Sequence, residues 1–195
     1  MNTDILFYIS DFLDDQSSFN LFLTNKYHSN LIKKYPSRYT IKKVVKDISK
    51  HKIKKLSYLQ NIPIINLPNS ITHLYLSATF NQPIHHLPSN LTHLYFGHRF
   101  NEIIHHLPSS IKYIHFGHRY NQPLPKLPSS LLNLYFGHHF NQPLNDLPPI
   151  LKRLSFGWSF NQPLKDLPLS LEVLLLGRYY FHKKNFHPSL KVFTL

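Results

Sequence analysis

The sequence contains no cysteine. This absence excludes disulfide bonds and cysteine-ligated zinc, and it agrees with an intracellular protein. The sequence also lacks a run of about eighteen apolar residues, so it predicts no transmembrane helix and no membrane partner. Its first residues, "MNTDILFYISDFLDD", are acidic and lack the basic start of a signal peptide. We therefore expect a cytoplasmic location, which for a viral protein means the cytoplasm of the host cell.

Acidic residues are scarce, with nine Asp and Glu against 22 Lys and Arg, so that the net charge is +13. Residues 1–25 hold four Asp and no Lys or Arg, whereas residues 26–55 hold eleven Lys or Arg and one Asp. The remaining residues hold eleven basic and four acidic side chains. The basic cluster at 26–55 has two interpretations, a solvated helix face or a contact with acidic protein or nucleic acid.

The shortage of acids also argues against catalysis. Beyond residue 55 the only carboxylates are Glu102, Asp146, Asp166 and Glu172, and no two of them are paired in sequence. The sequence has no glycine-rich phosphate loop and no nucleophile-elbow motif. Its fifteen histidines have neither cysteine nor nearby acids to complete a metal site. We predict a non-enzymatic protein with no catalytic residue, no metal and no cofactor.

Glycine is rare too, and its placement reveals an internal repeat. All five glycines are spaced by twenty residues, at Gly97, Gly117, Gly137, Gly157 and Gly177. Phe-Asn or Tyr-Asn recurs with the same spacing from residue 80 to residue 161, and Leu-Pro recurs from residue 67 to residue 168. A fixed period of this kind indicates a repeat architecture.

Each unit predicts one short strand, a turn and an extended return. The apolar pattern L-x-x-L-x-F ends in an alternation of apolar and other residues, which is the period of a strand. The prolines that follow exclude a helix on the return path, because each fixes φ and removes a backbone donor. The few apolar side chains of one unit cannot offset the entropy of ordering twenty residues, so the units must stack and pair their strands in parallel.

The invariant letters have structural interpretations. In one unit, Leu91, Leu94, Phe96 and Phe100 are expected to point inward. Asn101 and its equivalents are expected to form a buried ladder that hydrogen-bonds the backbone of neighbouring coils. The glycines indicate either a turn with positive φ or a close approach of two backbones.

The "FNQPL" and "LPSSL" motifs at this spacing resemble the FNIP repeat, which is related to leucine-rich repeats, over about residues 53–195. The resemblance implies a leucine-rich-repeat-like solenoid that is curved, with a parallel β-sheet on its concave face and an extended, proline-rich convex side. We expect two domains, a segment at 1–50 and a solenoid of 20-residue units at 51–195.

The first fifty residues predict a small α-helical cap, because Ile5, Leu6, Ile9 and Phe12 fall on one helical face. "TDILFYISDFLDDQSSFNLFLTNKYHSNL" resembles an F-box, although the usual Leu-Pro before the first helix is absent. The resemblance implies that Asp4, Ile5, Leu6 and Ile9 contact a Skp-family adaptor of a cullin ubiquitin ligase. The alternative is a helical cap that only seals the first coil.

The variable positions of the strand and of the following turn form the candidate binding surface. Aromatic residues and arginine are enriched where proteins bind other proteins. We therefore predict a partner-binding surface, for an acidic or phosphorylated protein segment, made of His73, Tyr75, His93, Tyr95, His98, Tyr113, His115, His118, Tyr135, His138, Arg153 and Trp158. The alternative is that these side chains only pack as ladders along the sheet.

Two further interpretations stay open. The basic charge and interleaved aromatic residues are also typical of a protein that binds RNA or single-stranded DNA. The pattern in "SLKVFTL" predicts a last strand whose edge is available for end-to-end self-association.

The favoured function is a substrate-binding subunit that resembles F-box adaptors of ubiquitin ligases. A plain interaction scaffold and a nucleic-acid-binding solenoid are the alternatives.

Overall fold

The computed structural model describes residues 6–7, 18–21, 43–44, 54–58, 61, 63–64, 67–182 and 186–194. Among these residues it contains strands and no helix. The strands are β1 (Leu6–Phe7), β2 (Ser18–Leu21), β3 (Lys43–Val44), β4 (Lys55–Tyr58), β5 (His73–Leu76), β6 (His93–Tyr95), β7 (Tyr113–His115), β8 (Asn133–Tyr135), β9 (Arg153–Ser155), β10 (Val173–Leu176) and β11 (Lys191–Thr194).

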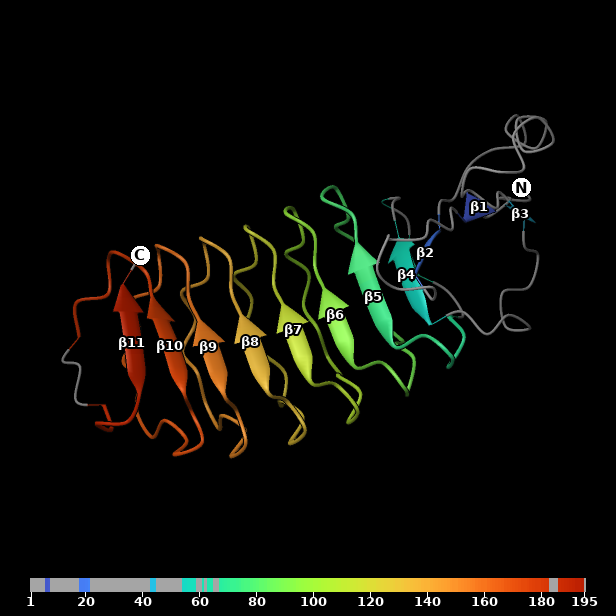
Figure 1. Cartoon of the computed structure of the whole chain (residues 1–195). Coiled ribbons are helices and arrows are strands. Elements are labelled where there is room, and N and C mark those ends of the chain that lie inside the picture. The colour runs from blue at the N-terminus through green and yellow to red at the C-terminus, as the bar shows by residue number, and fades with distance from the viewer. Residues whose placement is uncertain are drawn as a thin grey trace.

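Nine of these strands form one sheet in which every pair is parallel, in the order β11-β10-β9-β8-β7-β6-β5-β4-β2. Figure 1 shows β4 to β11 side by side, with all arrows pointing the same way and one return segment behind each strand. The chain is therefore a solenoid of the leucine-rich-repeat type, as the sequence predicts.

The register of the sheet follows the sequence period. From β5 to β10 each residue pairs with the one twenty positions later, so that Leu74, Leu94 and Ile114 are neighbours in one row. The first and last coils are shorter, because Leu56 pairs with Leu74 and Leu174 pairs with Val192. Both offsets are eighteen residues, two fewer than in the regular coils.

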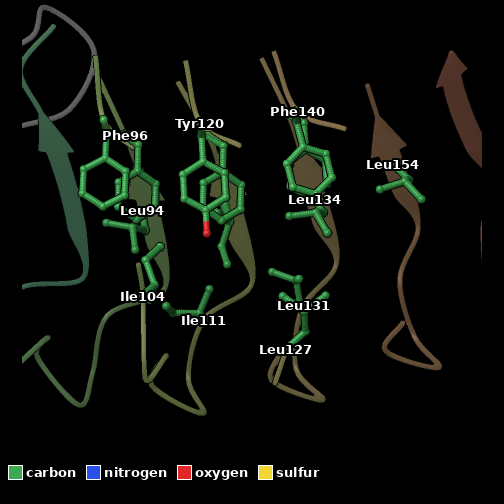
Figure 2. Packing of buried hydrophobic residues seen from close by; sticks show 14 of the residues in the cluster. Leu94, Phe96, Ile104, Ile111, Tyr120, Leu127, Leu131, Leu134, Phe140 and Leu154 are labelled. Atoms are coloured by element: carbon green, nitrogen blue, oxygen red, sulfur yellow. The ribbon is translucent and has the colours of Figure 1, made fainter. Parts of the chain in front are cut away.

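The core consists of columns of equivalent side chains from successive coils. The middle residue of each strand and both aromatic positions of the unit are buried through the regular coils. Phe96, Phe116 and Phe136 stack with ring centroids 5.1 and 5.2 Å apart. A second column of rings packs against the first, and Figure 2 shows two of its members, Tyr120 and Phe140, in line with Phe96 above the buried leucines. Their centroids are 6.2 Å apart. The predicted inward positions are confirmed.

The glycines mark a close approach of backbones. None of them has a positive φ. A Cβ added to Gly117 would collide with the carbonyl oxygen of Gly97, and one added to Gly97 would collide with that of Ser77. Of the two interpretations of this position, the structure supports the second.

The asparagines form the predicted ladder. The Oδ1 atom of Asn81 accepts a hydrogen bond from the backbone N–H of Asn101 at 2.7 Å, and Asn101 accepts in the same way from Asn121 at 2.8 Å. The pattern continues until the Oδ1 of Asn161 accepts from the N–H of Phe181 at 3.1 Å. These side chains are half-buried or exposed and not fully buried, because the turn that carries them lies at the edge of the core.

The structure does not support the predicted helical cap. Its described segments in residues 1–50 are strands: β2 pairs with β4, and β1 pairs antiparallel with β3. The helix prediction is wrong for these segments, since β4 offers an open strand edge whose backbone groups β2 satisfies. The rest of the cap lies outside the described residues, as do Asp4, Ile5 and Ile9 of the predicted adaptor-binding set. Leu6 lies in β1.

Candidate recognition surface

The outer face of the sheet carries the first part of the candidate site. In each strand from β5 to β9 the second residue points into the core, and the residues on either side of it are half-buried or exposed. This alternation is the two-residue period of a strand. Parallel pairing in register then places equivalent side chains of neighbouring coils directly beside each other.

Aromatic rings form a continuous contact network over this face, which we call the sheet-face ladder. It consists of His73, Tyr75, His93, Tyr95, Tyr113, His115 and Tyr135. His73 stacks on His93 with centroids 4.1 Å apart, and Tyr75 stacks on Tyr95 at 4.5 Å. Tyr113 contacts Tyr95 at 4.8 Å and Tyr135 at 5.2 Å, and so links the two columns of the ladder.

The packing of the ladder changes its ionisation. Burial raises the pKa of Tyr95, and the neighbouring hydroxyls of Tyr113 and Tyr75 raise it further. Burial, followed by the charges of Lys55 and Lys112, lowers the pKa of His93. Burial also lowers the pKa of His115. At neutral pH the imidazoles of His93 and His115 and the hydroxyl of Tyr95 are therefore uncharged, which suits hydrogen bonding and apolar contact.

The second part of the candidate site lies in the turns that follow the strands, and we call it the turn ladder. It consists of His98, His118, His138, His139 and Trp158. His118 stacks on His98 at 4.5 Å and contacts His138 at 4.2 Å, and His138 stacks on Trp158 at 4.8 Å. Half of the surface of Trp158 is exposed, at 51%.

His118 is the central ring of the turn ladder. Burial lowers its pKa, and the charges of His138, His98, His139 and Arg119 lower it further. Its Nδ1 atom is buried and has no hydrogen-bond partner among the described residues.

The structure thus divides the twelve predicted partner-binding residues into two groups. Eight lie on the sheet face, where Arg153 is exposed at the end of the row. Four, His98, His118, His138 and Trp158, lie in the turns. Sequence reasoning missed Tyr179, whose side chain is 53% exposed beside the turn ladder. Tyr179 lies two residues after Gly177, as Arg99 lies two residues after Gly97, and this equivalence in the repeat could have identified it from the sequence.

The described residues provide neither a metal centre nor a cluster of charges of both signs. No group of three or more His, Asp or Glu within that part of the chain is placed to hold a metal ion. The ring stacking explains this, because stacked imidazoles do not point their nitrogen atoms at one centre. Among the same residues, the ion pair is that between Lys152 and Glu172, at 3.0 Å, and both side chains are about half exposed.

Comparison with known proteins identifies the repeat. The model of the FNIP repeat matches residues 58–97, 80–119, 100–139, 120–146 and 140–179. A comparison with curated proteins finds no match. Among solved structures, the chain is similar to CroV588, described as a novel circular LRR protein, with 29% sequence identity and a TM-score of 0.32. The match covers 73% of this chain and 33% of the other, so it spans about a third of the length of CroV588. Within the described residues, no helix has the length and apolar character to cross a membrane.

Proposed function

The chain belongs to the FNIP repeat family, and we propose that it is a non-enzymatic recognition module that holds a protein partner on the sheet face. The observation that carries the proposal is the sheet-face ladder, in which seven rings from four adjacent strands form one half-buried to exposed aromatic surface. Aromatic side chains supply large contact area with little loss of conformational entropy, which is why they concentrate at protein interfaces.

The ladder is also rigid before any partner arrives. The backbone beneath it is hydrogen-bonded from coil to coil, and the Nδ1 atoms of His73 and His93 lie 2.9 Å from the hydroxyls of Thr72 and Thr92. A preformed surface loses less entropy on binding than a flexible one. The row of rings suits an extended segment of a partner that runs across the strands.

Affinity capture with three forms of the protein tests this proposal. The triple variant Tyr95→Ala, His115→Ala and Tyr135→Ala removes rings from three neighbouring coils of the ladder. A matched control, His85→Ala, His86→Ala and His105→Ala, removes three exposed rings from the return segments. We expect proteins captured from a eukaryotic lysate by the wild type to be lost with the triple variant and kept with the control.

A thermal melt of each variant accompanies the capture, so that a folding defect is recognised. If the triple variant remains folded and captures the same proteins as the wild type, the sheet face is not the binding surface. If both variants lose the same proteins, the contact is not specific to the ladder.

The coupling to a ubiquitin ligase stays a prediction from the resemblance of the first fifty residues to an F-box. Its residues Asp4, Ile5 and Ile9 lie outside the described part of the chain. We expect a Skp-family adaptor to co-purify with the wild type and to be lost after Ile5→Asp and Ile9→Asp. Capture of sheet-face partners without any adaptor would instead support a scaffold without ligase coupling.

A further inference from the structure

The turns after β6 to β10 lie along one edge of the sheet, next to the arrowheads in Figure 1, and their sequences are rich in basic and aromatic residues. The two positions after each glycine are occupied by His98-Arg99, His118-Arg119, His138-His139, Trp158-Ser159 and Arg178-Tyr179. We call this row the turn ridge. It contains the turn ladder together with three arginines and an additional tyrosine.

The backbone of the ridge is fixed from coil to coil. The N–H of Arg99 donates to the carbonyl of Ala78 at 2.9 Å, and the N–H of Arg119 donates to the carbonyl of His98 at 3.0 Å. His139 and Ser159 continue this pattern at 3.0 and 2.9 Å. The side chains therefore project from neighbouring coils with the spacing of parallel strands, about 4.8 Å.

The positive charge of the ridge is not compensated within the described part of the solenoid. Arg99, Arg119 and Arg178 are exposed, and none of them forms an ion pair with a described residue. The nearest acid in sequence, Glu102, accepts a hydrogen bond from the Nδ2 atom of Asn81 at 3.0 Å. Glu172 pairs with Lys152, and Asp146 and Asp166 lie in return segments.

From this arrangement we infer that the turn ridge binds an acidic segment of a protein partner, with carboxylates on Arg99 and Arg119 and apolar contact at Trp158 and Tyr179. The inference rests on the proposed function of the solenoid as a protein-recognition module, and it names the chemistry of a partner segment. The row from His98 to Arg178 crosses four strand spacings, or about 19 Å, which an extended peptide of about six residues spans.

Two observations favour a polypeptide over a nucleic acid. Nucleic acids are bound largely by neutralising many phosphates with Lys and Arg, whereas the ridge offers three arginines over five coils. Stacking of bases also requires free ring faces. The rings of His118 and His138 already stack or pack on their neighbours, so that their faces are covered.

The test measures binding of a fluorescent octaglutamate peptide by anisotropy to the full chain. The double variant Arg99→Glu and Arg119→Glu replaces two attractive contacts with two repulsive ones. We expect its affinity to fall by at least about fivefold, since each exposed ion pair contributes a factor of a few. The matched control, Lys126→Glu and Lys165→Glu, makes the same change of net charge on two exposed lysines of return segments. It should bind nearly as well as the wild type.

Three results would overturn the inference. An undiminished affinity of the arginine variant excludes the ridge as the site, and an equal loss in both variants indicates attraction to the net charge alone. An octathymidylate that binds the wild type more tightly than octaglutamate, and loses affinity in the arginine variant, identifies the ridge as a nucleic acid site.

The sheet-face triple variant separates this inference from the proposed function. It should bind octaglutamate like the wild type while losing its captured partners. If the sheet-face triple variant keeps its captured partners but the arginine variant binds octaglutamate weakly, the proposed sheet-face function is wrong. The turn ridge is then a binding site independent of the sheet face. If the sheet-face function holds but the arginine variant keeps the peptide, only the ridge inference fails.

Discussion

Gly117 lies directly over the carbonyl oxygen of Gly97, so closely that no side chain fits between the two coils. The same contact recurs at Gly137, Gly157 and Gly177. Strand β7 has ended two residues before Gly117 and the chain begins to turn, and here the backbones of successive coils approach each other more closely than a Cβ atom allows. Glycine occupies this position because a Cβ atom would collide with the neighbouring backbone, and not because its φ is unusual.

Replacing Gly117 with alanine should therefore destabilise the solenoid strongly. The added Cβ meets backbone atoms, which cannot rotate away, so we expect a loss of about 3 kcal/mol or more, at the upper end of the range for overpacking. Urea denaturation followed by circular dichroism measures the change. Ser77→Ala is the control, because residue 77 occupies the same position of the repeat and already carries a Cβ. An unchanged midpoint for Gly117→Ala would contradict the close contact.

The asparagine ladder makes a second prediction. Removing the Asn121 side chain in Asn121→Ala leaves the N–H of Asn141, now bonded at 2.9 Å, without its acceptor. We expect a loss of about 0.5–1.5 kcal/mol in free energy of unfolding, because the bond lies at the exposed edge of the turn, where water can partly replace it. Asn133→Ala is the matched control, since the Oδ1 of Asn133 is buried without a hydrogen-bond partner among the described residues and its removal should cost less. Equal losses in the two variants would show that the ladder bond contributes nothing specific.

Tyr120 occupies a column in which the coils before and after it carry Phe100 and Phe140. Its hydroxyl lies in the core, where burial raises its pKa, and its hydrogen bond to the carbonyl of Pro123 is long, at 3.4 Å. Tyr120→Phe should therefore change the free energy of unfolding by less than about 1 kcal/mol. Phe140→Ala should cost about 3–5 kcal/mol, because it leaves a cavity between two rings. A large loss for Tyr120→Phe would show that the hydroxyl bond is stronger than its length indicates.

The stability of the fold should decrease as the pH falls below about 6.5. The pKa values of His93, His115 and His118 are lowered in the folded chain, so the unfolded chain binds protons at a higher pH than the folded chain does. As the pH falls, the unfolded chain therefore takes up protons before the folded chain does. The free energy of unfolding decreases as a result. Urea midpoints at pH 7.5, 6.5 and 5.5 measure the decrease.

The contribution of the histidines is isolated by a variant. Replacing His115, whose pKa is lowered by burial, with Gln should reduce the slope of stability between pH 6.5 and 5.5. A slope identical to that of the wild type would mean that this imidazole is not the group that titrates.

The sequence by itself determined the period, the inward positions and the parallel stack. The residue types at Leu94, Phe96, Phe100 and Asn101 recur every twenty positions. This recurrence predicts stacked coils in which equivalent residues lie above one another and share a core. The apolar residues of a single unit are too few to fold alone, so stacking follows from elementary energetics. The partnering of the asparagines could be predicted for the same reason, because a half-buried amide beside a repeated backbone finds the next coil's N–H.

Only the tertiary structure decided what is set by distances between coils. The twenty-residue spacing does not reveal that Gly117 is required because a side chain would collide with the neighbouring coil. Glycine is favoured both by a close approach of two backbones and by a positive φ, so the residue type alone cannot distinguish the two. The spacing also does not reveal that Tyr113 contacts both Tyr95 and Tyr135 and so joins the two columns of the sheet-face ladder, because ring contacts depend on the distance and tilt between coils. The local pattern predicts a helix near Ser18–Leu21, but the structure has a strand there, whose pairing partner, Lys55–Tyr58, is distant in sequence. Any extended segment that hydrogen-bonds the free backbone groups of a sheet edge can pair with it. The local pattern of apolar residues therefore does not show which segment becomes a strand there.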